Sequence, residues 1–305
     1  MIVCSSCGSE FIKSPNLANP YCCPTCKSSP QRVGDFFSWA PELAAENEHF
    51  PFESFENLFE LEAGSFWFRS RNAVILWALG KYCPGFTSLL EIGCGTGFVL
   101  RAIKNKYPDV VIHGSEVHSS GLSYAKARLP DTELVQLDAQ KLPYKNEYDV
   151  IAAFDVIEHI KDDELVLKNI YNALNKNGFC LITVPQHRWL WSEVDDAACH
   201  QRRYSAADLH TKLTLAGFHI VKSTSFVSLL VPLMLAARRS ATRDGKQCAT
   251  VGLGLNSSLD KALSIVMSLE LVLLKMGISL PVGGSRLVIA RKIHLEVDHD
   301  SSEVH

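Results

Sequence analysis

The amino-acid sequence predicts an α/β fold with a doubly wound sheet, preceded by a small cysteine-rich module. From Ser88 onward, short apolar segments alternate with helical segments, as in a series of βαβ units. A loop with three glycines follows the first apolar segment, where such folds bring the backbone close to a ligand. Five of the 10 cysteines lie in the first 26 residues, which indicates a metal site ahead of the larger domain.

Length and composition limit the possible functions. The 305 residues are enough for one sizeable α/β domain and a small module. The net charge of −3 gives no general attraction to nucleic acid, so a nucleic-acid partner is not expected. We expect no signal peptide, because MIVCSSCGSEF has no basic region before an apolar core. No apolar run reaches the roughly 18 residues of a spanning helix, and we expect a cytoplasmic protein.

The first 34 residues are predicted to form a zinc ribbon. Cys4 and Cys7 form one Cys-x2-Cys pair, and Cys23 and Cys26 form a second pair after 15 intervening residues. Four thiolates at this spacing match a closed, structural Zn²⁺ site. The segment has few large apolar residues and needs such a staple, although free surface thiols are the alternative. The ribbon could bind RNA or protein, or only cap the larger domain.

The rest of the chain divides into three parts. Residues 35–80 are rich in aromatic side chains and are expected to act as a helical lid or linker, and the apolar spacing from Leu58 to Leu79 predicts one or two helices. The main domain is expected over residues 81–292. A flexible acidic tail is expected over residues 293–305.

Strands and helices alternate through the main domain. Tyr148–Phe154 is apolar throughout, as expected of a parallel strand buried on both faces. Pro108 and Gly217 mark helix ends. The expected strands are Ser88–Ile92, Val110–Gly114, Glu133–Gln136, Tyr148–Phe154, Phe179–Val184, Phe218–Lys222 and Arg286–Arg291. The expected helices are Phe98–Tyr107, Ser119–Leu129, Asp162–Leu174 and Ser205–Ala216.

The glycine loop LLEIGCGTGF is the main indication of a cofactor. Gly93, Gly95 and Gly97 lie between the first strand and its helix, where glycines allow a tight turn and a close approach to a ligand. A nicotinamide dinucleotide is the alternative ligand, but its fingerprint places the third glycine where this chain has Phe98. Glu91 precedes the loop, and a carboxylate suits an ammonium and a sulfonium better than phosphates. The loop therefore favours S-adenosylmethionine.

Acidic residues follow the next three strands. Glu116 lies about 20 residues past the loop, where an acid accepts hydrogen bonds from ribose hydroxyls. Asp138 follows the third strand and could receive the adenine amino group. Asp155 follows the fourth strand, beside the place expected for the methionine part. All three are predicted at the ligand edge of the sheet.

These motifs together resemble class I S-adenosylmethionine-dependent methyltransferases, and are similar to the ubiquinone-biosynthesis O-methyltransferases and their type 11 relatives. The resemblance covers about residues 60–292 and includes EIGCGTG, DAQKLPY, FDVIEHI and NGFCLITVP. It implies a Rossmann-like, seven-stranded sheet whose last strand is antiparallel. It departs from many relatives at Glu116, where they have Asp. The cofactor contacts that we expect are Glu91, Gly93, Cys94, Gly95, Gly97, Glu116, Asp138, Ala139 and Asp155, with the Cys94 thiol packing rather than reacting.

Three histidines are candidates for the general base that deprotonates an acceptor hydroxyl: His159, His187 and His200. His159 follows the fourth strand, and the other two lie in the segment HRWLWSEVDDAACHQRRY, which we interpret as a lid over the acceptor. Two adjacent arginines in this lid could hold a phosphate or carboxylate of the acceptor. A salt-bridge cluster that only holds the lid is the alternative. The acceptor-binding candidates are Trp189, Trp191, Asp195, Arg202, Arg203 and Tyr204.

An apolar insertion is expected over about residues 226–281, between the last two strands. Phe226–Ala237 and Leu259–Leu274 are strongly apolar, and basic residues follow the first stretch. Such a segment, through residues 226–275, could touch the inner face of a membrane or form a channel for a lipid-linked acceptor. A homodimer interface or an extra core layer is the alternative.

The sequence thus predicts a methyltransferase that acts on an oxygen, or alternatively on a nitrogen, of a small or lipid-linked acceptor. The lid, the insertion and the final GGSRLVIARK resemble bacterial methyltransferases of surface-polysaccharide or lipid pathways. An RNA methyltransferase that uses the ribbon to hold its substrate is one alternative. A non-catalytic scaffold that binds adenosylmethionine is another.

Overall fold

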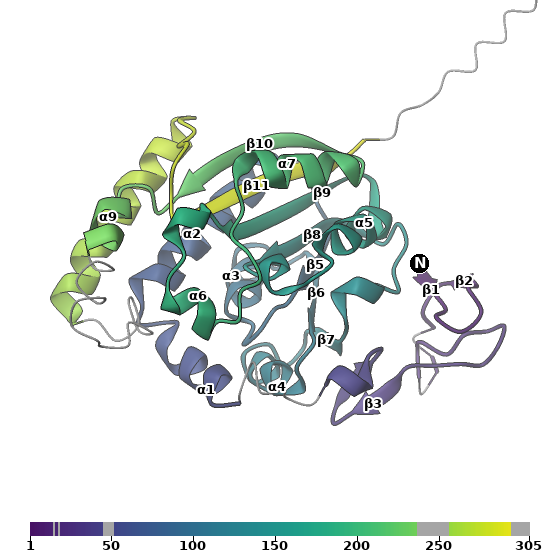
Figure 1. The fold of residues 1–305 in the computed structure, drawn as a ribbon. Coiled ribbons are helices and arrows are strands. Elements are labelled where there is room, and N and C mark those ends of the chain that lie inside the picture. Colours follow the sequence, from purple (N-terminus) through teal and green to yellow (C-terminus); the bar gives the residue numbers. More distant parts are fainter. Residues whose placement is uncertain (15, 18, 45–51, 237–255, 294–305) are drawn as a thin grey trace, which may run out of the picture.

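The computed structural model describes residues 1–14, 16–17, 19–44, 52–236 and 256–293. A single twisted sheet forms the centre of the molecule, with helices on both faces (Figure 1). In spatial order its strands are β10 (Phe218–Phe226), β11 (Ser285–Lys292), β9 (Leu174–Pro185), β8 (Tyr148–Phe154), β5 (Ser88–Ile92), β6 (Val111–Glu116), β7 (Glu133–Gln136), β4 (Phe36–Ser38) and β3 (Gln31–Val33).

The described sheet has nine strands, so the predicted count of seven was wrong. The seven predicted strands are all present, and β11 is antiparallel to both β9 and β10, as expected. The two additional strands form the β3–β4 hairpin, which joins the open edge of β7 with parallel pairing of Phe37 to Val135. QRV and FFS are too short to show a strand pattern in the sequence. The expected boundary at residue 34 falls inside this hairpin.

The helices cover the two faces in the alternating manner of a doubly wound fold. They are α1 (Phe52–Leu61), α2 (Phe66–Tyr82), α3 (Phe98–Lys106), α4 (Ser119–Arg128), α5 (Asp163–Ala173), α6 (Glu193–Ala197), α7 (Ala206–Leu215) and α9 (Ser257–Lys275). Segment 58–79 thus forms two helices, and α2 runs past the expected domain start at residue 81.

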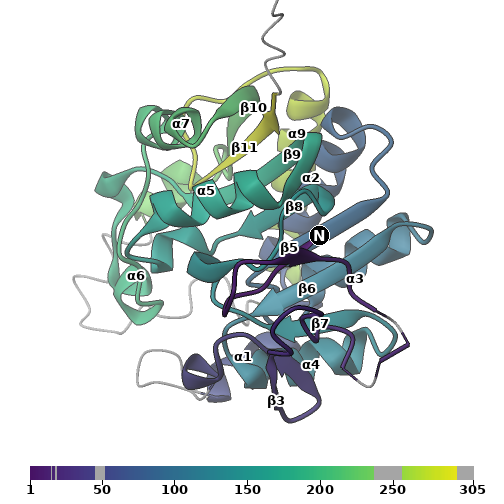
Figure 2. The same cartoon turned by 90° about the vertical axis from the view of Figure 1, so that its right-hand side faces the viewer.

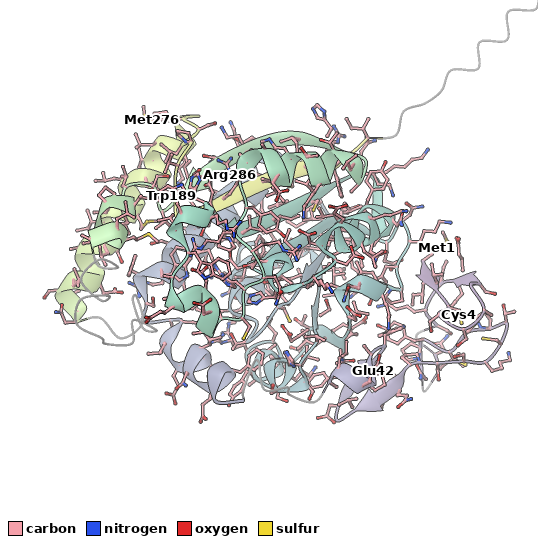
Figure 3. All side chains as sticks on the ribbon, viewed as in Figure 1. Met1, Cys4, Glu42, Trp189, Met276 and Arg286 are labelled. Carbon is pink, nitrogen blue, oxygen red and sulfur yellow. The ribbon has the colours of Figure 1, made fainter. Side chains whose placement is uncertain are left out.

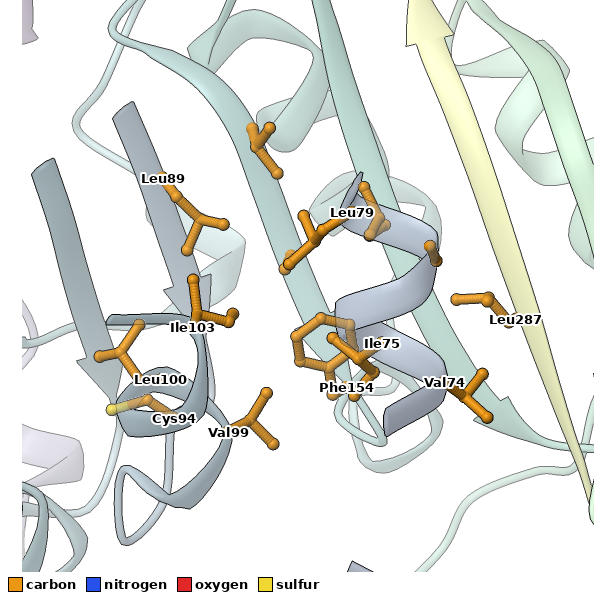
Figure 4. Close-up of a cluster of buried hydrophobic side chains, with 14 of the residues drawn as sticks. Val74, Ile75, Leu79, Leu89, Cys94, Val99, Leu100, Ile103, Phe154 and Leu287 are labelled. Atoms are coloured by element: carbon orange, nitrogen blue, oxygen red, sulfur yellow. The ribbon is translucent and has the colours of Figure 1, made fainter. Parts of the chain in front are cut away.

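Successive residues of each central strand serve opposite core layers. Leu89 packs with α2 and α3 on one face, whereas Leu90 packs with α5 and α7 on the other. Figure 4 shows the first layer, where Ile75 and Leu79 of α2 lie beside Phe154 of β8. This packing makes α2 part of the core, because one face of the apolar central strands would be exposed to water without it.

The N-terminal module is docked on the α5 side of the sheet, in front of it in Figure 2. Its strands β1 (Ile2–Val3) and β2 (Glu10–Phe11) form a small hairpin. The backbone N–H of Val3 donates to the carbonyl of Pro143 over 2.8 Å, and Lys13 pairs with Glu133 over 2.7 Å. Figure 3 labels Met1 and Cys4 in this module, at the opposite end of the molecule from α9.

The insertion provides a core layer on one side and an apolar surface on the other. Leu263, Met267 and Leu274 of α9 are buried and pack with α2. The carboxylate of Glu270 accepts hydrogen bonds from the backbone of Ser228 and Leu229 at 2.7 and 2.8 Å. Residues 237–255, with the predicted basic segment, and the predicted tail over 294–305 lie outside the described residues. Among the described residues, no helix is long and apolar enough to span a membrane.

Candidate active site

The glycine loop connects β5 to α3 with three left-handed backbone positions. Gly93, Gly95 and Gly97 have φ angles of 66°, 50° and 74°. A Cβ atom on Gly93 would meet the side chain of Val156 at 2.5 Å, and one on Gly97 would meet Ala125 at 3.1 Å. At Gly95 a Cβ atom would meet nothing within 4 Å. The outer glycines are therefore required by packing, and Gly95 faces open space that a ligand can enter.

Glu116 at the end of β6 holds this loop. Its Oε2 accepts from the backbone N–H of Gly95 over 3.0 Å. Its Oε1 accepts from the backbone N–H groups of Val117 and His118 at 2.8 and 3.2 Å. Three backbone donors hold the carboxylate in place at the mouth of the loop, where the sequence predicts a ribose contact.

Asp138 occupies the corresponding place after β7. It caps the short helix Ala139–Lys141 by accepting from the backbone N–H of Gln140 over 2.8 Å. The side chains of Asp138 and Ala139 are buried at the same edge of the sheet as Glu116. Cys94 is buried too, and its sulfur lies 3.0 Å from the position of a Cβ on Gly114. Its thiol therefore has a packing role in this structure.

Glu91 is a buried carboxyl group directly before the loop. Its Oε2 has no hydrogen-bond partner among the described residues. Burial raises its pKa to about 8, although the nearby Arg71 guanidinium lowers it. A ligand with a positive charge would stabilise the ionised form of Glu91, because its charge would replace the stabilisation by water that burial removes.

Arg71 connects α2 to the end of β8 and was not predicted from the sequence. Its guanidinium forms a salt bridge with Asp155, whose backbone has a φ angle of 57°. The left-handed turn directs the chain from β8 into the segment that carries Glu158 and His159. Asp155 therefore lies at the predicted edge, already paired within the protein.

A buried cluster of Glu62, Thr96 and Arg128 clamps α1 onto the glycine loop. The Thr96 hydroxyl donates to Glu62 over 2.6 Å, and Arg128 pairs with the same carboxylate oxygen. Arg128 also donates to the carbonyl of Phe59 over 2.9 Å and lies over its ring. These contacts join residues more than 30 positions apart, so no local pattern could indicate them.

Asp195 organises the predicted lid from inside. It is fully buried and accepts from Nδ1 of His200 over 2.8 Å and from Nε of Arg203 over 2.6 Å. The backbone N–H of Ser192 donates to its other oxygen over 2.8 Å. Burial by itself would raise the pKa of Asp195, but these hydrogen bonds lower it to about 2.

Arg202 and Tyr204 anchor the lid to α5. Arg202 and the Tyr204 hydroxyl reach the same oxygen of Asp163 at 2.9 and 2.6 Å, and Tyr204 is fully buried. Both predicted acceptor arginines are therefore engaged with internal carboxylates, which is the arrangement of the alternative salt-bridge cluster. Trp189 and Trp191 are exposed by 56% and 36%, so part of each ring faces solvent, although the Trp191 Nε1–H donates to Asp196 over 3.0 Å.

The structure brings two of the three candidate histidines together. The rings of His159 and His200 lie 4.8 Å apart, next to the fully buried Glu158. Burial, followed by the charge of His200, lowers the pKa of His159 to about 4. His187 instead stacks on Trp189 with ring centroids 5.0 Å apart. Glu158 was not singled out in the sequence, although its place beside His159 could have indicated it.

The four predicted cysteines converge in the N-terminal module. Sulfur atoms of Cys4 and Cys26 lie 3.5 Å apart, and those of Cys7 and Cys23 lie 3.7 Å apart. A tetrahedral zinc ion with Zn–S bonds of about 2.3 Å would separate its ligands by about 3.8 Å. The four thiols therefore fit a zinc ion.

Comparisons with known proteins agree with this geometry. Residues 90–180 match the family model described as a methyltransferase domain. The chain is similar to a probable S-adenosylmethionine-dependent methyltransferase of Mycolicibacterium smegmatis, with 29% identity over 160 residues that cover 51% of this chain and 60% of that protein. The chain thus spans about three-fifths of that relative's length.

Two solved structures share the fold. Phosphoethanolamine N-methyltransferase 2 of Haemonchus contortus, in complex with S-adenosyl-L-methionine, has a TM-score of 0.56 at 17% identity, over 81% of this chain and 59% of that one. A complex of the Haloferax volcanii Trm112 methyltransferase activator with a methyltransferase gives a TM-score of 0.55 at 15% identity, over 82% of this chain and 100% of that one. At such identities the likeness concerns the fold.

The strand order and the glycine loop agree with a class I methyltransferase fold, and residues 90–180 match a methyltransferase-domain model. The described residues therefore form a methyltransferase-like fold, with a cysteine module docked on the α5 side of its sheet.

Proposed function

We propose that the protein transfers a methyl group from S-adenosylmethionine to an oxygen of a small or lipid-linked acceptor in a glycan pathway. One observation carries the proposal: Glu116 holds the glycine loop so that Gly95 faces open space, beside the unpartnered Glu91. Open space with a carboxyl group on each side suits a ligand that has ribose hydroxyls and a cationic amino-acid part, whose positive charge would favour ionised Glu91.

Different residues of the chain would contact different parts of the cofactor. Glu91 and Asp155 would face the amino-acid part of the cofactor, Glu116 its ribose, and Asp138 with Ala139 its adenine. When bound, S-adenosylmethionine supplies a methyl group that is activated by a positive sulfur. The protein then needs to align the acceptor oxygen and exclude water, which is the role we assign to the lid and its exposed tryptophans.

The acceptor would approach from the lid side, past His159 and His200. These two groups lie at the carboxyl edge of β8, where doubly wound sheets bind their ligands. The proton of an acceptor hydroxyl would leave through this cluster, with His187 as the other candidate base.

An exposed stripe of apolar side chains on α9 supports the proposal that the acceptor lies at a membrane surface. Its members are four apolar side chains at helical spacing, exposed by 63%, 58%, 50% and 71%: Ile265, Leu269, Val272 and Met276. Figure 3 shows Met276 at the outer end of this helix. Lys261 and Lys275 lie on the same helix, so the stripe would sit on an anionic membrane. A homodimer would cover the same stripe, and that is the competing occupant.

We also propose that the cysteine module holds one structural zinc ion and caps the domain. Its basic side chains are used internally: Lys13 pairs with Glu133, and Arg32 lies 4.3 Å over the ring of Phe37. This use favours capping over binding of RNA.

A methyl-transfer assay tests the proposal. Purified protein would be incubated with adenosylmethionine labelled in its methyl group and with bacterial extract divided into lipid and aqueous fractions. We expect label in a lipid or glycan fraction with the wild type and none with Gly95→Arg. Label only in RNA would favour the RNA methyltransferase. Cofactor binding without label in any fraction would favour the scaffold.

A further inference from the structure

Glu158 is the most isolated carboxylate in the part of the chain that the structure describes. It is fully buried, and neither of its oxygens has a hydrogen-bond partner among the described residues. Leaving a buried carboxylate unpaired is costly, so either a proton or a cation should compensate it. Its Oε1 points toward Nε2 of His200, which lies 4.0 Å away, too far for a direct hydrogen bond.

The surroundings of Glu158 resemble those of a metal site. One ligand atom each from Glu158, His159 and His200 lie within 4.8 Å of one another. Donors at about 2.1 Å from a metal ion lie roughly 3 to 4 Å apart, so small side-chain rotations would complete the site. The three residues come from the turn after β8 and from the lid, which a shared ion would tie together.

Hydrogen bonds with residues of the lid already orient both imidazole rings. Asp195 accepts from Nδ1 of His200, which leaves Nε2 as the nitrogen that faces Glu158. The His159 ring has hydrogen-bond partners on the lid backbone at Ala198 and Cys199. Carboxylate or carbonyl partners of this kind commonly hold metal-binding histidines in place.

Local charge leaves room for a cation. Asp155 is paired with Arg71, and Asp195 is paired with Arg203, whereas no Lys or Arg among the described residues forms an ion pair with Glu158. One carboxylate and two imidazoles suit a divalent ion of intermediate softness, such as Mn²⁺, Fe²⁺ or Zn²⁺. Three protein ligands leave open positions for substrate oxygens.

We propose that Glu158, His159 and His200 bind a divalent transition-metal ion that holds the acceptor's hydroxyl group for methylation. The role of the metal ion in methyl transfer rests on the proposed function, whereas the binding of the ion by these residues does not. The ion would bind the hydroxyl oxygen and favour release of its proton to His187 or to solvent, because His159 and His200 would then act as ligands and not as bases. The oxygen would form a bond to the methyl carbon while the S–CH3 bond breaks, with its electron pair remaining on sulfur. The products are the methyl ether, adenosylhomocysteine and one proton.

Titration with Mn²⁺ tests the site directly. Manganese has little affinity for the thiolate cluster, so protein loaded with one zinc can be titrated while the electron paramagnetic resonance signal of free Mn²⁺ is recorded. We expect one Mn²⁺ per chain in the wild type. Glu158→Gln and His200→Asn should each weaken binding by about tenfold or more, whereas His210→Gln, outside the cluster, should not.

Two results would overturn the proposal. One is the absence of Mn²⁺ binding by the wild type at millimolar concentration, which requires no variant to fold and would mean that Glu158 carries a proton. The other is unchanged binding in Glu158→Gln. Calorimetric binding of adenosylmethionine by the same samples is measured in parallel. If the wild type does not bind adenosylmethionine, the proposed function is contradicted, whereas the proposal of a metal site is unaffected.

Discussion

The backbone N–H of Gly95 donates to the carboxylate of Glu116 over 3.0 Å, across 21 residues of sequence. This hydrogen bond joins the loop after β5 to the end of the neighbouring strand β6. It leaves the Cβ side of Gly95 open and directs an anionic group to the same opening. The site that we propose for the cofactor is therefore formed before any ligand enters, which would reduce the entropy lost on binding.

The Glu62–Arg128 ion pair should contribute substantially to stability. Both side chains are largely buried, and Arg128→Met would leave the Glu62 carboxylate without its cationic partner. We expect a loss of about 3 to 5 kcal/mol in the free energy of unfolding, measured by urea denaturation. Lys141→Met, which removes the exposed pair with Glu42 at 4.0 Å, is the matched control and should have little effect. Equal effects of the two variants would argue against a structural role for the clamp.

Glu91 should make the stability of the ligand-free protein depend on pH. Burial raises its folded-state pKa to about 8 from an ordinary value of 4.5, so the folded state binds the proton more tightly than the unfolded state. The resulting stabilisation is fully present below about pH 4.5 and is lost as the pH rises through 8.

Glu91→Gln removes this contribution. We therefore expect the free energy of unfolding of the variant, minus that of the wild type, to be larger at pH 9 than at pH 6. Urea denaturation at both pH values measures this difference. Parallel pH profiles for the two proteins would show that Glu91 titrates normally. The variant should also bind adenosylmethionine more weakly, because it lacks the negative charge.

Removal of the metal from the cysteine module should destabilise the whole chain. Cys4 and Cys23 are buried in the same apolar cluster as strands β5 and β8. Cys4→Ser should reduce the zinc content below one per chain and lower the Tm by roughly 5 °C or more. Cys22→Ser is the control, because its thiol donates to the backbone carbonyl of Lys27 and is not one of the four converging sulfurs. A Cys4→Ser protein with full zinc content would exclude Cys4 as a ligand.

The stripe on α9 should bind anionic vesicles. We expect the wild type to sediment with vesicles that contain phosphatidylglycerol. Ile265→Ser combined with Leu269→Ser should reduce this binding by about tenfold, because two exposed apolar side chains are lost. Leu215→Ser removes an equally exposed apolar side chain on α7 and should have no effect. Concentration-dependent dimers that the double variant abolishes, without vesicle binding, would instead identify a homodimer.

The sequence was sufficient for the elements that a repeating or local pattern encodes. The parallel strands and their helices follow from alternation of apolar segments, and the loop of Gly93, Gly95 and Gly97 follows from its place after the first strand. The convergence of the four cysteines follows from their spacing. These features depend on residues that are close in the chain.

Contacts between distant segments could not be predicted in the same way. Arg71 reaches Asp155, and Arg128 reaches Glu62, across 84 and 66 positions. The charge pattern of the lid was visible, but not that Arg202 would turn inward to Asp163. The β3–β4 hairpin was missed because its pairing with β7 is decided by the docking of the module, not by its three-residue strands.

Calorimetric titration of the zinc-loaded protein with S-adenosylmethionine and S-adenosylhomocysteine tests the central claim most directly. We predict saturable binding of one equivalent in the micromolar range. Glu116→Ala should weaken it by about tenfold or more, since a charged hydrogen-bond acceptor is lost, whereas Asp131→Ala on the surface should not. Gly95→Arg should abolish it, because the side chain would fill the open space. Absence of binding by a wild-type protein that is folded and zinc-loaded would contradict the assignment of the site.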